Sequence, residues 1–228
     1  MRKSVMPAVA LAVLCGLASA APAAAADQAA IVEDLRGPPT EVAPLDYLAS
    51  GAVIHLNAQN VIVIDFLRSC TRETIHGGTI RVGALQSEVT DGRVERQKVS
   101  CDGGRRQVPA TSGSEGAAPS FAAPPRPRGQ PGEGGVERTL YGRNPLFDLG
   151  GPGRLVLERM DQQGEKIELD ITAGELLHGR FYDFAKEDRS LKRGGIYRAT
   201  FGRRTIVFLV DPLAKSGATP LAGRLLRF

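Results

Sequence analysis

Cys70 and His76 are the residues whose types and spacing come nearest to a catalytic pair. The local sequence reads Ser69-Cys70-Thr71-Arg72, and His76 follows a few positions later. A cysteine becomes a strong nucleophile when an adjacent histidine takes its proton. One hypothesis for the chain is therefore an envelope enzyme, a hydrolase or transferase, that uses this thiol.

The same segment resembles that of the L,D-transpeptidases, which use a cysteine with a nearby histidine and arginine. In that family a His-Gly element precedes the cysteine motif, and a glycine stands directly before the cysteine. Here His76-Gly77 follows Cys70, and Ser69 stands before it. The reversed order favours a structural role for Cys70.

The first 26 residues have the three-part pattern of a secretory signal peptide. Arg2 and Lys3 supply a positive start, and positions 5–17 are apolar apart from one glycine. This stretch is too short to span a bilayer. Small residues follow and offer cleavage after Ala20 or after Ala26. We therefore expect an exported protein of the Gram-negative type, periplasmic or secreted.

Export makes the cysteines informative. Cys15 lies within the predicted signal peptide, so Cys70 and Cys101 are the remaining thiols. Two thiols in an oxidising compartment usually pair. The predicted disulfide would restrict the unfolded chain by roughly 3–4 kcal/mol. A redox-gated sensor, in which this bridge opens, is an alternative.

Other residues with chemical potential are scattered. Asp46, Asp65 and Glu73 could supply a pair of carboxylates for glycoside hydrolysis. That reaction requires a defined distance between the two carboxylates, and nothing in the sequence sets this distance. The three histidines are His55, His76 and His178, and their spacing in the sequence does not match a metal-binding motif. We therefore expect them to be structural. The sequence also lacks a Gly-x-Ser-x-Gly elbow, a Walker loop and a GxGxxG unit. We expect no metal, no cofactor and no enzymatic activity.

Charge and composition give no indication of a nucleic-acid partner. The 228-residue chain has a net charge of +4, and without Arg2 and Lys3 it holds 27 basic against 25 acidic residues. Tryptophan is absent and aromatic residues make up 5%, too few for a stacking platform. After the signal peptide, no apolar run approaches the roughly 20 residues of a transmembrane helix. The remaining candidates for contact with an anion or a partner are five arginines that we expect at the surface: Arg198, Arg203, Arg204, Arg224 and Arg227.

Short strands between turn residues fill residues 42–101, and we predict a first β domain over residues 27–101. Residues 44–50 allow one helical turn, and 52–56 and 60–67 are apolar strand candidates. A turn at Gly77-Gly78 precedes a strand over 79–82. Residues 86–90 and 93–99 flank Asp91-Gly92, the strongest short-range signal for a hairpin.

Residues 102–139 are rich in glycine, proline, serine and alanine, and this composition predicts a flexible linker. Residues 140–228 are rich in strand patterns again. We expect hairpins that pair 154–158 with 166–171 and 195–201 with 205–210, and a final strand over 221–228. The fold class is therefore all-β, with two small domains joined by a Pro/Gly-rich linker.

Leu191, Gly194 and Tyr197 resemble the tyrosine corner of Greek-key sandwiches, in which the tyrosine hydroxyl bonds to nearby backbone. Arg193 stands where that pattern usually has proline. The resemblance implies an immunoglobulin- or fibronectin-III-like sandwich over residues 140–228. Such a scaffold implies no chemistry by itself.

The stretch from Gly51 to Gly83, an apolar strand, a polar turn and a Gly-rich turn, resembles the periplasmic FecR-type domain, a β roll or sandwich. FecR proteins sense or relay signals outside the inner membrane, but this chain lacks their transmembrane helix. Together the patterns predict an exported, non-catalytic binding or scaffold protein of the bacterial cell envelope. Its partner would be another envelope protein or a cell-wall component.

Overall fold

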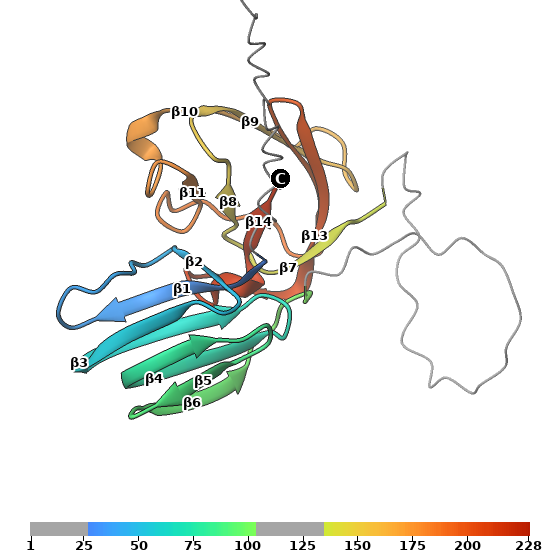
Figure 1. Ribbon diagram of the computed structural model, residues 1–228. Helices are drawn as coiled ribbons and strands as arrows, with labels where there is room; N and C mark the ends of the chain where they lie inside the picture. Colours follow the sequence, from blue (N-terminus) through green and yellow to red (C-terminus); the bar gives the residue numbers. More distant parts are fainter. Residues whose placement is uncertain (1–26, 104–134) are drawn as a thin grey trace, which may run out of the picture.

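The computed structural model describes residues 27–103 and 135–228 (Figure 1). Within these ranges the chain is all-β, as the sequence predicts, and its helices are two short 3-10 turns, η1 (Ala173–Glu175) and η2 (Leu221–Gly223). No helix there is long and apolar enough to cross a membrane. The predicted signal peptide, and positions 104–134 of the predicted linker, lie outside the described residues. We call residues 27–103 the first unit and residues 135–228 the second unit.

The first unit is one antiparallel sheet with the strand order β2-β1-β3-β4-β5, and β6 also pairs with β4. Its apolar core includes Ile54, Ile62, Ile64, Phe66 and Ile75. The strands are β1 (Gln28–Arg36), β2 (Tyr47–Ala49), β3 (Val53–Phe66), β4 (Thr71–Val82), β5 (Ser87–Thr90) and β6 (Arg93–Lys98). The helical turn predicted over 44–50 is wrong, because β2 occupies 47–49.

The hairpin predicted around Asp91-Gly92 is also wrong. β5 and β6 lie end to end along β4: β5 pairs with Thr79–Val82 and β6 with Thr71–His76. The predicted turn at Gly77-Gly78 is instead a distortion within β4, where both glycines have positive φ. A Cβ on Gly92 would lie 2.2 Å from the Gly77 carbonyl oxygen. The glycines therefore permit a close backbone approach, not a chain reversal.

The second unit is a sandwich of two sheets. A five-stranded sheet has the order β10-β9-β12-β13-β7, and a three-stranded sheet has the order β11-β8-β14. Side chains from both sheets share one core, which includes Leu155, Tyr197 and Phe208 from the larger sheet and Phe147 and Leu226 from the smaller. The strands are β7 (Arg138–Gly142), β8 (Leu146–Asp148), β9 (Gly153–Arg159), β10 (Lys166–Ile171), β11 (Phe181–Asp183), β12 (Ile196–Phe201), β13 (Arg204–Lys215) and β14 (Leu225–Arg227).

Both hairpins predicted in the second unit are present. β9 pairs with β10, and β12 pairs with β13. The strand predicted over 221–228 is shorter than expected, because η2 occupies 221–223 and β14 covers 225–227. β7 begins at Arg138, two positions before the predicted start of this domain.

The backbone contact expected of a tyrosine corner is present. The Lys192 amide donates a hydrogen bond to the Tyr197 hydroxyl oxygen over 3.0 Å. Leu191 and Tyr197 are buried, and Gly194 has a φ of +72°. The hydroxyl also donates to Glu165 Oε1 over 3.1 Å. Tyr197 thereby fixes the chain that enters β12.

The two units pack directly against each other. An apolar cluster joins Ile31 and Leu67 of the first unit to Leu146, Phe181 and Leu221 of the second. Figure 1 shows the red C-terminal segment reaching the blue part of the first sheet, where η2 contacts β1 and β3. The junction between the units is therefore a buried interface.

Candidate functional site

An ionic cluster of Glu33, Asp65 and Arg72 lies at this interface. Asp65 on β3 stands opposite Arg72 on β4, and Arg72 Nε donates to Asp65 Oδ1 over 2.9 Å. The same guanidinium donates through Nη2 to Glu33 on β1. All three side chains are nearly enclosed, with exposed fractions of 7% for Glu33, 0% for Asp65 and 14% for Arg72. Three adjacent strands thus deliver two carboxyl groups to one guanidinium.

The second unit reaches this cluster through the backbone of η2. The Leu221 amide donates to Glu33 Oε2 over 2.8 Å, and the Ala222 amide donates to Asp65 Oδ2 over 3.0 Å. The first amides of a helical turn have no hydrogen-bond acceptor within the turn. At η2, carboxyl oxygens of the first unit accept the hydrogen bonds of these amides. This contact fastens the second unit to the first.

The charges in the cluster do not balance unless one carboxyl holds a proton. Burial and the nearby Asp65 raise the pKa of Glu33 to about 8, although the Leu221 amide and Arg72 oppose the rise. Near neutral pH, Glu33 therefore carries its proton while Asp65 and Arg72 form the ion pair. The cluster is then neutral overall, which suits its burial.

A pocket of about 230 Å³ opens beside Glu33, between the two units. Leu45 contributes to its wall from the first unit, and Leu177, His178, Lys186 and Thr219 contribute from the second. Leu45 has a φ of +72° and His178 a φ of +51°. Left-handed backbone is unusual for residues other than glycine and is concentrated at functional sites. The pocket combines this backbone with a carboxyl group of shifted pKa, which makes it our candidate functional site.

Arg224 and Asp183 form a buried ion pair on another wall of the pocket. Arg224 Nη1 donates to Asp183 Oδ1 over 2.6 Å, and Nη2 donates to Oδ2 over 3.0 Å. A further bond joins Nη1 to the Asn144 carbonyl oxygen over 3.0 Å. The guanidinium is 2% exposed and its charge is balanced. The remaining polar side chains that line the pocket are those of Glu33, His178, Lys186 and Thr219.

The structure separates the five arginines that the sequence analysis grouped as contact candidates. The prediction that Arg224 lies at the surface is wrong, because its charge is needed beside Asp183 in the interior. Arg227 lies at the interface, where it donates to Gln28 and lies over the Tyr47 ring. Arg204 donates to the Leu149 carbonyl oxygen and lies over Phe201 and Phe228.

Arg198 and Arg203 belong to the β12–β13 hairpin. Arg198 is half-buried on β12, 3.9 Å from Glu158. Arg203 is exposed at the turn that follows β12. Because Arg224 is buried with Asp183, and Arg204 and Arg227 donate to other protein groups, the five do not form one shared anion site.

Cys70 and Cys101 form the predicted disulfide, with their Cα atoms 5.5 Å apart. Cys70 therefore has no free thiol for the proposed pairing with His76. His76 lies on β4, 3.5 Å from an Arg93 nitrogen, and His55 Nδ1 lies 3.2 Å from Thr79 Oγ1. Of the three histidines, His178 is the one that lines the interface pocket.

The three acids considered in the sequence analysis occupy separate environments. Asp46 accepts a hydrogen bond from the Ala43 amide, and Glu73 is buried beside Arg96. Asp65 alone joins the interface cluster, where its carboxyl partner is Glu33. Glu33 was not among the acids predicted from the sequence; the one local signal is its position directly after the apolar run 29–32. Within residues 27–103 and 135–228, no group of histidine, cysteine or acidic side chains is arranged to hold a metal ion.

No family model, no curated protein and no solved structure matches the chain.

Proposed function

We propose that this chain is an exported, non-catalytic binding or scaffold protein of the bacterial cell envelope. Its first unit would be a FecR-like domain and its second an immunoglobulin-like sandwich. The observation that carries the proposal is the pocket between the units, which is lined by the polar side chains of Glu33, His178, Lys186 and Thr219. Concave sites at domain interfaces are common ligand sites. The partner would be another envelope protein or a cell-wall component.

The fixed geometry around the pocket favours binding over turnover. Asp65, the carboxylate nearest to Glu33, is fully buried and already bonded to Arg72 and to the Ala222 amide. Its lone pairs serve the contact between the units, so it is poorly placed to activate water.

A second candidate function is an envelope hydrolase that uses Glu33 as a proton donor. The raised pKa of Glu33 beside a pocket is the observation that favours it, because catalytic acids need a proton near neutral pH. The Glu33→Gln variant separates the two functions. A binding site keeps its shape with the amide, whereas a proton donor is lost.

The experiment that tests the proposal uses a photoreactive amino acid at Lys186, on the exposed rim of the pocket. A matched probe at Glu88, exposed on β5, is the control. We expect a discrete adduct with an envelope component from the Lys186 probe in intact cells and none from the Glu88 probe. An additional Ala218→Trp substitution, which fills the pocket, should abolish the adduct, whereas Ala58→Trp on exposed β3 backbone should not.

Two outcomes would contradict the proposal. One is the absence of an adduct at Lys186. The other is hydrolysis of an envelope polymer by the purified protein that Glu33→Gln abolishes without loss of stability.

A further inference from the structure

A second hollow, of about 560 Å³, lies on the first unit beside the disulfide. Its lining residues come from the β3–β4 turn, from the end of β6 and from the loop before β5: Ser69, Thr71, Ala84, Leu85, Gln86 and Lys98. Lys98 is the single charged residue among them. The hollow is separate from the pocket between the units, and the proposed function does not use it.

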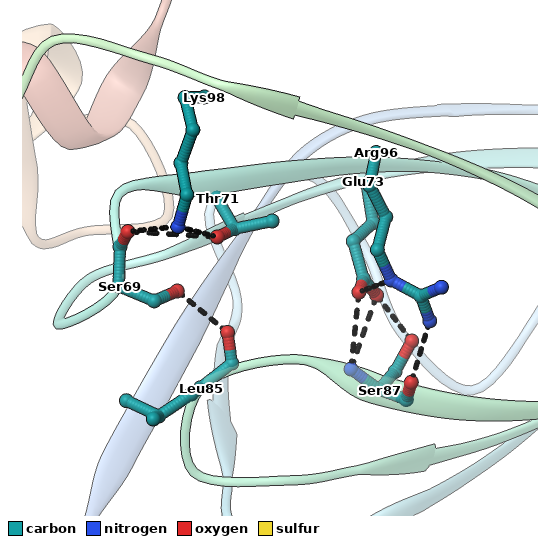
Figure 2. Close-up of polar contacts among 7 residues, drawn as sticks. All are labelled: Ser69, Thr71, Glu73, Leu85, Ser87, Arg96 and Lys98. Atoms are coloured by element: carbon teal, nitrogen blue, oxygen red, sulfur yellow. Dashed lines mark hydrogen bonds and ion pairs between the residues drawn. The ribbon is translucent and has the colours of Figure 1, made fainter.

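The Lys98 ammonium is held in place by two uncharged oxygens. It donates to the Ser69 carbonyl oxygen and to Thr71 Oγ1, each over 2.9 Å (Figure 2). An ammonium has three N–H groups, so one remains for a ligand. Within the described ranges, no carboxylate forms an ion pair with Lys98.

The neighbouring cation, Arg96, is already neutralised. Its Nε donates to Glu73 over 2.7 Å, and its Nη2 donates to the Ser87 carbonyl oxygen over 2.7 Å. Glu73 is fully buried and also accepts hydrogen bonds from Ser87. Figure 2 shows these two arrangements side by side on one face of the sheet. The uncompensated positive charge of this face therefore lies at Lys98.

A hydrogen bond and the disulfide hold part of the wall of the hollow in place. Ser69 Oγ donates to the Leu85 carbonyl oxygen over 2.5 Å, which ties the loop before β5 to the β3–β4 turn. Thr71 is buried, and Cys70 between them is bonded to Cys101. A site with fixed walls loses less conformational entropy when it binds.

Three features define the chemistry of the ligand. A single ammonium with one free N–H matches a monoanion better than phosphate, which is recognised by several donors or by an arginine fork. Leu85 is 53% exposed and, with Ala84, gives the hollow an apolar wall. β6, whose pairing partner is β4, is an edge strand next to the hollow and offers backbone groups to an extended chain.

We propose that this hollow binds the free carboxylate end of a peptide, with the carboxylate on Lys98 and a small apolar side chain against Leu85. The Thr71 hydroxyl and the Ser69 carbonyl position the ammonium. Main-chain groups of the peptide pair with the edge of β6.

The test is an NMR titration of the 15N-labelled protein with N-acetyl-Ala-Ala as the free acid, with its C-terminal amide, and with inorganic phosphate. We expect the free acid to shift the amide signals of Leu85, Gln86 and Lys98 in a saturable way, and the other two probes to bind far more weakly. Equal binding of the amide, tighter binding of phosphate, or no saturable shift with the acid would overturn the proposal.

Three substitutions sharpen the test. Lys98→Met should weaken binding of the free acid by roughly tenfold or more, since a hydrogen bond to a charged group is lost. Thr71→Val should weaken it several-fold, because the ammonium loses one of its two anchors. Lys166→Met, on β10 of the second unit, should leave affinity unchanged. Unchanged affinity in Lys98→Met, with the wild-type spectrum otherwise retained, would also overturn the proposal.

Discussion

Glu33 accepts a hydrogen bond from the backbone amide of Leu221, a residue 188 positions farther along the chain. The bond joins the central part of the first sheet to the last turn of the second unit. Because Asp65 accepts from Ala222 in the same way, a pair of carboxyl groups anchors η2. The pocket beside Glu33 depends on this contact, since its two walls belong to different units.

The first prediction concerns pH. Glu33 has a pKa of about 8 in the folded protein against an ordinary value of 4.5, so the folded state binds its proton more tightly. Its contribution to stability is therefore fully present below pH 4.5 and is lost as the pH rises through 8. The slope is at most about 1.4 kcal/mol per pH unit in this window.

Glu33→Gln keeps the shape but cannot ionise. We expect the free energy of unfolding of this variant, measured by urea denaturation, to match that of the wild type near pH 5. At pH 9 the variant should be the more stable of the two. Glu88→Gln, at an exposed site, should follow the wild type throughout. If the free energies of unfolding of Glu33→Gln and the wild type changed with pH in the same way, the raised pKa of Glu33 would be contradicted.

The second prediction concerns the buried pair of Asp183 and Arg224. Asp183→Ala leaves the Arg224 guanidinium in the interior without its counter-charge, so we expect a loss of about 3–5 kcal/mol in the free energy of unfolding. The control is Glu158→Ala, which removes the partner of Arg198 in an ion pair that is more exposed than that of Asp183 and Arg224. It should lower the free energy of unfolding by about 0–1 kcal/mol. Equal effects of the two substitutions would show that the pair is not enclosed.

The sequence predicts those elements of this fold whose signals are local. The β12–β13 hairpin follows from two β-branched and aromatic runs around Gly202, and the disulfide follows from two cysteines in an exported chain. The hairpin prediction at Asp91-Gly92 is wrong because this dipeptide is compatible both with a hairpin turn and with a close contact between strands. In this protein the close strand contact forms because Gly77 and Gly78 lie opposite Asp91-Gly92.

The candidate site was harder to predict. Glu33 belongs to β1, which the sequence analysis did not identify, because the run 28–36 alternates poorly and no turn signal precedes it. Its partners, Asp65 and Arg72, come from two other strands, and η2 comes from the far end of the chain. Contacts of such separation depend on register and packing, which single-sequence patterns do not determine. The burial of Arg224 likewise depends on long-range packing, here against Asp183.

The third prediction concerns the tyrosine corner. Tyr197→Phe removes the hydroxyl that accepts from the Lys192 amide and donates to Glu165. We expect the variant to lose about 1–2 kcal/mol of stability, the value of a typical hydrogen bond with one partner left unpaired. Tyr141→Phe, at a half-buried tyrosine on β7, is the control and should change the stability little. An unaltered denaturation midpoint in Tyr197→Phe would show that the corner is not a stabilising feature.

The fourth prediction concerns the disulfide. Cys70→Ser combined with Cys101→Ser should lower the free energy of unfolding by roughly 3–4 kcal/mol, and a reducing agent should do the same to the wild type. The reagent should have no effect on the double variant. Two reactive thiols in the unreduced, unfolded wild type would disprove the bridge.

Hydrogen exchange of the Leu221 and Ala222 amides is the most direct measurement of whether the two units are fastened into one frame. At pH 6, where Glu33 holds its proton, both amides should be protected as strongly as the core amides of β3, and Asp65→Ala should expose Ala222. Exchange of both amides at the rate of an open loop in the wild type would show that η2 is not anchored, and the pocket between the units would then have no fixed walls.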